Sequence, residues 1–261
     1  MNTSKGNALL TTIRDLARRR GRERRGLALA EGVRLVEEAL AAGVPVRGAA
    51  VSSALEGTAR GSALKSALAS RAVPLVEVTP GELDALADTE QPQGIVAVIE
   101  PRGWTLDDIP ASAGAVVLVL DAVQDPGNVG TMLRTALALG ASGVVALKGT
   151  AELTNPKVLR SSMGAGFRLP AAAVDVEAFI AWASARGLEL VVAAANGAPV
   201  ERRRRGPAPI ALVVGNEGAG VSAALAAAAA RRVAIPLGPA VESLNVAVAA
   251  GILLYEVTRD A

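Results

Sequence analysis

The sequence predicts an α/β fold built from two layered domains. Short apolar runs of strand length alternate with segments of helical period along almost the whole chain. The run at 115–120 is continuously apolar and rich in Val and Leu, as in parallel strands that are covered on both faces. One stretch, 100–114, breaks the alternation with Pro101, Gly103, Pro110 and Gly114, so it marks a domain boundary.

The first half of the chain predicts a small α/β domain. Apolar runs predict strands at 27–30, 46–51, 74–78 and 95–99, and helical periodicity predicts helices at 31–42, 60–70 and 80–87. Pro80 stands at the first position of the last of these helices, where its missing N–H costs nothing. We place a basic arm at 1–25, this domain at 26–105 and a linker at 106–114.

The second half, 115–261, predicts a mostly parallel sheet. Strands are expected at 115–120, 143–147, 210–214 and 233–235, helices at 129–139, 155–163 and 245–257, and further alternating elements at 174–185 and 188–193. An Ala-rich helix follows the glycines of 215–220. The helix at 245–257 is apolar nearly all the way round, so we expect it to be buried.

Polar residues follow two strands of the stretch 209–256 without an evident structural reason. Asn216 and Glu217 lie in a turn with three glycines, and Ser243 and Asn245 lie in the turn that opens the last helix. Open α/β sheets bind ligands at the carboxyl ends of their strands. The alternative is that the glycines only allow positive φ and that Ser243 is only an N-cap.

A third polar turn follows the strand at 115–120. Asn128 ends it, and Arg134 lies six residues further on, within two turns of the next helix. Its position near this turn makes Arg134 a candidate for a functional role. The alternative is a structural ion pair of Arg134 with Asp121 or Asp125.

The composition excludes several kinds of chemistry. The chain has no Cys and no His, which excludes disulfides, thiolate nucleophiles, imidazole bases and almost all transition-metal sites. The glycines of 215–220 are spaced G-x-x-G-x-G, which is not the dinucleotide fingerprint, and no P-loop motif occurs. No apolar run reaches the length of a membrane span and no signal peptide is evident, so we expect a cytoplasmic protein without a membrane partner.

Basic residues are clustered although the formal net charge is only +2. Residues 1–25 hold eight Lys or Arg against Asp15 and Glu23, and 201–205 reads ERRRR. The first cluster suggests contact with nucleic acid or another anionic surface, and the second is a further candidate contact with phosphate. Plain solvated surface is the alternative for each. Only five aromatic residues exist, so we expect RNA contacts to be mainly electrostatic.

Three ordered motifs resemble those of the SpoU (TrmH-like) branch of the SPOUT RNA methyltransferases. They are the segment from Asp121 through Asn128 to Arg134, the segment Gly-Asn-Glu-Gly-Ala-Gly at 215–220, and the segment from Ile235 through Ser243 to Asn245. The first half also resembles that family's small substrate-binding domain of the ribosomal protein L30e type, through 30–34 and 93–96. The resemblance covers nearly the whole chain beyond the basic arm.

The resemblance implies S-adenosylmethionine as methyl donor, a ribose 2′-hydroxyl of RNA as acceptor, a homodimer, no metal and a trefoil knot in the C-terminal domain. It implies a catalytic group and a cofactor-binding group that share one residue. The catalytic residues are Arg134, Asn128, Glu217, Ser243 and Asn245. The cofactor-binding residues are Gly215, Asn216, Gly220, Ile235, Leu237, Ser243 and Leu244.

The extra N-terminal domain resembles that of ribosomal RNA enzymes, so ribosomal RNA is the expected substrate. Methylation of transfer RNA, and ribosomal RNA methylation that gives antibiotic resistance, are alternatives within the class. A non-catalytic RNA-binding protein is an alternative from another class, and methylation of a small molecule is a third. Methyl transfer needs an aligned acceptor oxygen and no imidazole or metal, which suits this composition.

Overall fold

The computed structural model describes residues 3–200 and 208–258, and the arginines at 202–205 lie outside this part of the chain. It divides into two compact units, each of which contains a sheet. Unit 1 comprises residues 1–102 and 154–167, and unit 2 comprises residues 103–153 and 168–261. The first boundary lies next to the expected linker, but the segment 154–167 groups with unit 1 although it follows in the sequence a strand of unit 2.

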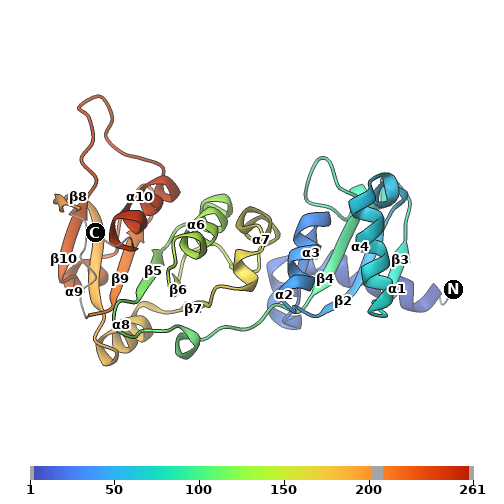
Figure 1. The fold of residues 1–261 in the computed structure, drawn as a ribbon, viewed down its shortest axis with the longest axis horizontal. Coiled ribbons are helices and arrows are strands. Elements are labelled where there is room, and N and C mark those ends of the chain that lie inside the picture. The colour runs from blue at the N-terminus through green and yellow to red at the C-terminus, as the bar shows by residue number, and fades with distance from the viewer. Residues whose placement is uncertain (1–2, 201–207, 259–261) are drawn as a thin grey trace. The chain divides into compact units, whose positions relative to one another are not determined.

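Unit 1 is built on a mixed sheet with the strand order β1-β4-β2-β3. The central β4 (Ile95–Ile99) runs antiparallel to β1 (Ala28–Glu31) and β2 (Val46–Val51), and β3 (Leu75–Glu77) is parallel to β2. The predicted bounds of β2 and β4 are confirmed to the residue. Buried side chains of these strands point alternately to the two faces of the sheet, so each face has its own hydrophobic cluster. The result is a three-layer domain at the blue end of the chain (Figure 1).

Helices cover both faces of this sheet. Helices α3 (Val33–Ala41) and α4 (Ala59–Ser70) pack on one face together with η1 (Ser53–Gly57), and α1 (Thr3–Leu16) and α5 (Pro80–Asp84) pack on the other. Thr79 caps α5 in a reciprocal capping box with Glu82, and this bonding by the Thr79 N–H and hydroxyl holds the pKa of Glu82 below its ordinary value.

The expected basic arm is two helices, α1 and α2 (Arg19–Arg25), and part of it belongs to the core. Ile13 and Leu16 are fully buried against the sheet, which corrects the expectation of a separate arm. Arg22 is also buried and donates to the carbonyl oxygens of Leu16 and Ala17 at 2.9 and 3.0 Å. Apolar positions spaced three and seven residues apart in 9–16 carry the signal for this burial, and the run of arginines obscured it.

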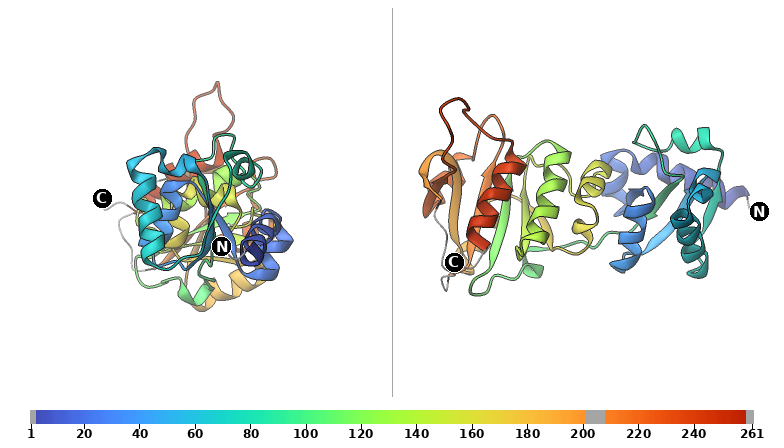
Figure 2. Two further views of the ribbon diagram at one scale, coloured as in Figure 1. Left: turned by 90° about the vertical axis from the view of Figure 1, so that its right-hand side faces the viewer. Right: turned by 45° about the horizontal axis from the view of Figure 1, so that its top comes forward.

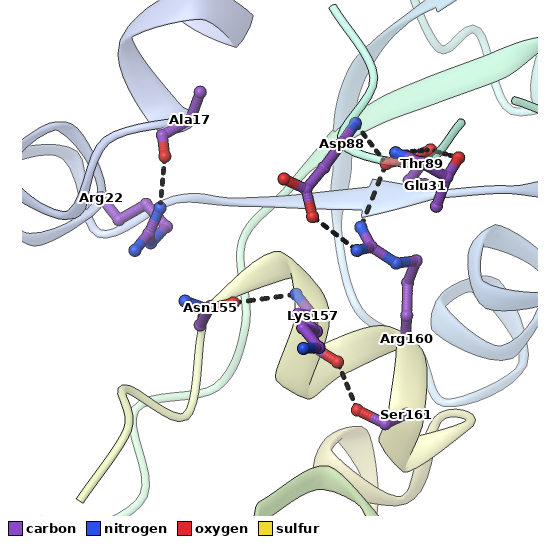
Figure 3. A network of polar contacts seen from close by, with 9 residues as sticks. All are labelled: Ala17, Arg22, Glu31, Asp88, Thr89, Asn155, Lys157, Arg160 and Ser161. Carbon is purple, nitrogen blue, oxygen red and sulfur yellow. Dashed lines mark hydrogen bonds and ion pairs between the residues drawn. The ribbon is translucent and has the colours of Figure 1, made fainter. Parts of the chain in front are cut away.

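The segment 154–167 completes unit 1. Its helix α7 (Pro156–Ser162) begins after the N-cap Asn155 with Pro156 at N1, as predicted, and is followed by η3 (Ala165–Phe167). Leu159 and Phe167 join the same hydrophobic cluster as α3 and α4. Arg160 donates to the buried carboxylate of Glu31 at 3.1 Å and to Asp88 at 2.5 Å (Figure 3).

Unit 2 is built on a fully parallel sheet with the strand order β10-β8-β9-β5-β6-β7. The six strands are β5 (Val116–Asp121), β6 (Gly143–Leu147), β7 (Ala171–Val174), β8 (Glu189–Pro199), β9 (Ile210–Gly215) and β10 (Arg231–Ala234). The bounds of β6 are those predicted. The short β7 escaped prediction because Ala-rich segments carry little strand propensity.

Two pairs of helices cover the faces of the parallel sheet. Helices α8 (Val176–Ala185) and α9 (Ala223–Ala228) bury Phe179, Ala183 and Leu225 with alternate residues of the strands. Helix α6 (Pro126–Ala138) packs beside α10 (Val246–Thr258), as the right-hand view shows (Figure 2). A short 3₁₀ turn, η2 (Leu106–Asp108), precedes the first strand.

Helix α10 differs from the expectation of full burial. Its residues Val246, Ala250, Leu253 and Leu254 are buried, but Val248, Ile252 and Tyr255 are exposed, at 51%, 36% and 48%. These three residues recur at intervals of four and three, so they form one stripe along the helix. An all-apolar helix can lie at the surface of one chain when its outer stripe meets another molecule.

Candidate active site

Helix α6 begins earlier than expected and brings Asn128 into its first turn. Asp125 is the N-cap, with its carboxylate accepting from the Asn128 N–H at 2.7 Å, and Pro126 occupies N1. Ala122, the residue directly after β5, has a positive φ of 56°, so the chain turns sharply at the end of this strand. The side chain of Asn128 is thereby fixed at the carboxyl edge of the sheet.

The turn after β9 is shaped by Asn216. Its side-chain oxygen accepts from the N–H groups of Gly218 and Ala219 at 2.9 and 3.0 Å, and its amide donates to the carbonyl of Ala122 at 3.0 Å. A Cβ on Gly215 would lie 2.3 Å from the backbone of Gly220, so only glycine fits there. Asn216 therefore joins the β9 turn to the β5 turn and holds Glu217 at its tip.

Asn245, and not Ser243, is the residue that caps α10. Its side-chain oxygen accepts from the N–H groups of Ala247 and Val248 at 2.9 and 3.3 Å. These two N–H groups are therefore not available to a ligand. Ser243 is exposed and makes no hydrogen bond with any residue that the structure describes.

Hydrogen bonds join the three motifs. The amide of Asn245 donates to the side-chain oxygen of Asn128 at 3.1 Å, and the amide of Asn128 donates to the carboxylate of Glu217 at 2.9 Å. Each side-chain NH₂ group donates to the next residue, so the hydrogen bonds run in one direction, from Asn245 to Glu217. Residues from three distant parts of the sequence thus orient one carboxylate.

A cavity of about 540 Å³ opens beside this carboxylate. Its walls include Val214, Val233, Val241 and Leu253, and its volume is that of a small-molecule site. All the cofactor-binding residues expected from the resemblance line it: Gly215, Asn216, Gly220, Ile235, Leu237, Ser243 and Leu244. Sequence reasoning did not single out Val214, Val233 and Leu253, because an apolar side chain in a strand or helix looks like ordinary core.

Arg134 lies on α6, outside the residues that line the cavity. Its side chain is exposed and forms no hydrogen bond or ion pair within the described residues. The alternative of an ion pair with Asp121 or Asp125 is not observed. Asp121 is buried and accepts from the Ser222 N–H at 2.6 Å, and Asp125 caps α6.

Within residues 3–200 and 208–258, no helix is long and apolar enough to cross a membrane. In that same part of the chain, no group of three or more Asp and Glu side chains is arranged to hold a metal ion.

The fold and the three joined motifs define a class of protein, and comparison with known families identifies it. Residues 115–255 match the SpoU rRNA Methylase family, and residues 7–97 match the MRM3-like substrate binding domain. The chain therefore belongs to the SpoU rRNA methylase family. It is an S-adenosylmethionine-dependent RNA methyltransferase with an N-terminal substrate-binding domain.

Relatives of known sequence resemble the chain along much of its length. It is 34% identical to an uncharacterized tRNA/rRNA methyltransferase of Synechocystis sp., over 99% of this chain and 93% of that protein. It is 42% identical to the 23S rRNA (guanosine(2553)-2′-O)-methyltransferase RlmP of Bacillus subtilis, over 66% of this chain and 67% of that protein.

Solved structures of two bacterial enzymes share the whole fold. The AdoMet-bound rRNA methyltransferase from Sinorhizobium meliloti matches with a TM-score of 0.85 and 31% identity, over 96% of this chain and 94% of that chain. The SpoU methyltransferase AviRb from Streptomyces viridochromogenes, in complex with the cofactor AdoMet, matches with a TM-score of 0.84 and 31% identity, over 96% and 97%.

The cavity suits S-adenosylmethionine on its own chemistry. The N–H groups of Ile235, Leu237 and Leu244 donate to no acceptor among the described residues, so they are free to bind adenosine heteroatoms. Among the described residues, those that line the cavity include the carboxylates of Glu217 and Glu242 and no Lys or Arg, which favours a cationic sulfonium. Apolar walls suit the adenine ring.

Proposed function

We propose that this protein methylates the 2′-hydroxyl of a ribose in ribosomal RNA with S-adenosylmethionine as donor. The observation that carries the proposal is the chain of hydrogen bonds from Asn245 through Asn128 to Glu217 beside the cavity. A structural role would need only the helix caps that Asp125 and Asn245 already supply. The further bonds orient the exposed carboxylate of Glu217 at the cavity, and a substrate that binds there would explain this orientation.

The cofactor site in this proposal is the cavity. Gly215, Asn216 and Gly220 line it from the β9 turn, and Ile235, Leu237, Ser243 and Leu244 line it from the segment between β10 and α10, where backbone groups hold the adenosine. Bound S-adenosylmethionine supplies an electrophilic methyl group on a sulfonium. The residues of the chain bind it, exclude water from it and align the acceptor oxygen.

Arg134 has an electrostatic role in the proposal. A guanidinium is always protonated, so it cannot act as a simple base. Its exposed side chain has no partner among the described residues and can bind the phosphate next to the target ribose in a bidentate manner. The same charge stabilises negative charge that develops on the 2′ oxygen as its proton leaves.

Glu217 is the proposed proton acceptor. One carboxylate oxygen of Glu217 accepts from Asn128, which leaves the other oxygen for the 2′-hydroxyl. Asn245 holds Asn128 so that Asn128 presents its donor side to Glu217. Ser243 lines the cavity, has no hydrogen-bond partner in the described part of the chain, and is proposed to position the sugar.

Ribosomal RNA is the proposed substrate because RlmP is a 23S rRNA methyltransferase and the Sinorhizobium protein is an rRNA methyltransferase. The N-terminal unit, which matches a substrate-binding domain, is proposed to bind the RNA around the target. An enzyme that methylates ribosomal RNA works where ribosomes are made. The proposal therefore includes a cytoplasmic location.

A homodimer and a knotted C-terminal domain are also part of the proposal. The exposed stripe Val248, Ile252 and Tyr255 on α10, with Leu137 at 38% exposure on α6, offers an apolar surface for a second copy. A two-fold interface uses the same patch on both subunits. The trefoil knot is proposed from family membership.

Two measurements test the function. Calorimetry should show binding of S-adenosylmethionine to the folded protein, and Ser243→Ala should weaken it. Mapping of 2′-O-methyl groups in ribosomal RNA from cells with and without the protein should reveal one site that depends on it. Absence of cofactor binding in folded protein would sink the proposal.

A further inference from the structure

A second cavity, of about 450 Å³, lies within unit 1 at the carboxyl ends of the parallel strands β2 and β3. Its residues come from the start of η1, from α4 and from the turn that opens α5. It belongs to the unit that matches a substrate-binding domain and has no part in the proposed cofactor site.

One buried polar group at this cavity has no hydrogen-bond partner among the described residues. Ser52 lines it, is only 6% exposed, and its hydroxyl makes no hydrogen bond, although its backbone N–H and carbonyl are both bonded. Leaving a buried hydroxyl unsatisfied costs about 1–3 kcal/mol. In a substrate-binding domain, a ligand that supplies the missing hydrogen-bond partner would explain such a hydroxyl.

The charged groups around the cavity show which ligand suits it. Lys65 bridges Glu56 at 3.0 Å and Glu77 at 3.2 Å through one oxygen of each, and these two contacts raise the pKa of Lys65. The second oxygen of each glutamate is left to accept from a ligand. Glu82 also lines the cavity, so three carboxylates stand against one ammonium group and would repel a phosphate.

An uncharged ligand with N–H donors, an adjacent acceptor and flat apolar faces meets these conditions. Free glutamate oxygens accept from N–H groups, the Ser52 hydroxyl can donate or accept, and Val51, Val78 and Pro80 supply apolar walls. A nucleobase edge offers these groups, but only when the base is unpaired. Sequence-specific RNA recognition uses such splayed-out bases.

We propose that this cavity binds one unpaired nucleobase of the RNA substrate, with Ser52, Glu56 and Glu77 reading its edge. The proposal rests on the proposed function, because it takes RNA as the ligand of unit 1. It gives the substrate-binding domain a specificity site that is separate from phosphate contacts. Binding there would be far less sensitive to salt than binding through arginines.

The test compares two probes in high salt, where phosphate contacts are screened. One is a short single-stranded RNA of mixed sequence, and the other is the same ribose-phosphate chain without bases. The natural protein should bind the RNA at least ~10-fold more tightly than the abasic chain, the worth of one charge-assisted hydrogen bond. Glu77→Gln and Ser52→Ala should each remove most of this preference.

Glu100→Gln is the matched control. Glu100 is an exposed carboxylate paired with Arg47 at the opposite end of the same sheet, so its loss changes the charge and one ion pair equally. It should leave the preference for bases unchanged. Equal behaviour of Glu77→Gln and Glu100→Gln, or no preference for bases in the natural protein, would overturn the proposal. Retained cofactor binding and methylation in that case would leave the proposed function standing.

Discussion

The side-chain amide of Asn128 donates to the carboxylate of Glu217 at 2.9 Å, across 89 residues of sequence. Asn128 lies in the first turn of α6, and Glu217 lies at the tip of the turn after β9. The parallel pairing of β5 with β9 brings these two turns to the same edge of the sheet. The bond is the point at which two motifs become one site.

Replacement of Asn128 by Ala should lower the methylation rate by about 100-fold, because a misplaced reacting group loses this much. The affinity for S-adenosylmethionine should change little, since Asn128 does not line the cavity. Gln124→Ala is the control, because Gln124 is an exposed amide of the same segment without a hydrogen bond in the described part of the chain. Single-turnover rates and calorimetry on both variants make the comparison. Equal rates for the two variants would remove Asn128 from the mechanism.

Arg134→Ala should reduce turnover by about 100-fold or more while thermal stability stays near that of the natural protein. Arg134→Lys should fail nearly as badly, because an ammonium group on a flexible stem cannot make the planar bidentate contact with phosphate. Single-turnover methylation and thermal melting of both variants test this. A destabilised Ala variant with a nearly active Lys variant would instead mean a structural ion pair.

Arg160→Met should destabilise unit 1 by about 1–3 kcal/mol, because Glu31 is buried and would lose its countercharge. The three donors from Asp88 and Thr89 that remain on Glu31 limit the loss (Figure 3). Hydrogen exchange at the Asp88 and Thr89 amides should accelerate. Arg186→Met removes an exposed pair with Asp107 and should cost less than about 1 kcal/mol. Similar losses for both variants would contradict a special role of the buried pair.

Arg18 and Arg20 are the candidates for phosphate contacts in the N-terminal segment. Both are exposed and unpaired within the described residues, whereas Arg24 and Arg25 pair with Asp15. Changing both to Gln should weaken RNA binding and lower the salt slope by about 2. Arg186→Gln with Arg231→Gln, two arginines paired with carboxylates, is the control of equal charge. Unchanged slopes in both would mean that this face is only solvated. Deletion of residues 1–25 is not a clean test, because it removes the buried Ile13 and Leu16.

Ile252→Glu should convert the expected dimer to a monomer, because it places a charge in the middle of the exposed stripe of α10. Ala227→Glu, at an exposed position of α9, should leave the mass unchanged. Light scattering at several protein concentrations measures both. A natural protein that is monomeric throughout would refute the dimer and leave the stripe unexplained.

The sequence alone was enough for the α/β class, for most of the strands and helices, and for the family. Strand and helix periodicity is local, so the bounds of β2, β4 and β6 could be predicted to the residue. The three motifs are also local, and their order along the chain identified Arg134, Asn128, Glu217 and Asn245 as candidates. The sequence shows each of these residues only within its own turn. It therefore left a purely structural role open as the alternative for each residue.

The tertiary structure decided what depends on contacts between distant residues. It showed that Asn245 caps α10 and orients Asn128, that α1 belongs to the core, and that 154–167 packs in unit 1 through Leu159, Phe167 and Arg160. It also showed that the buried hydroxyl of Ser52 has no partner within residues 3–200 and 208–258. Burial and hydrogen-bond partners are properties of the packed chain, and residue types at a given spacing do not determine them.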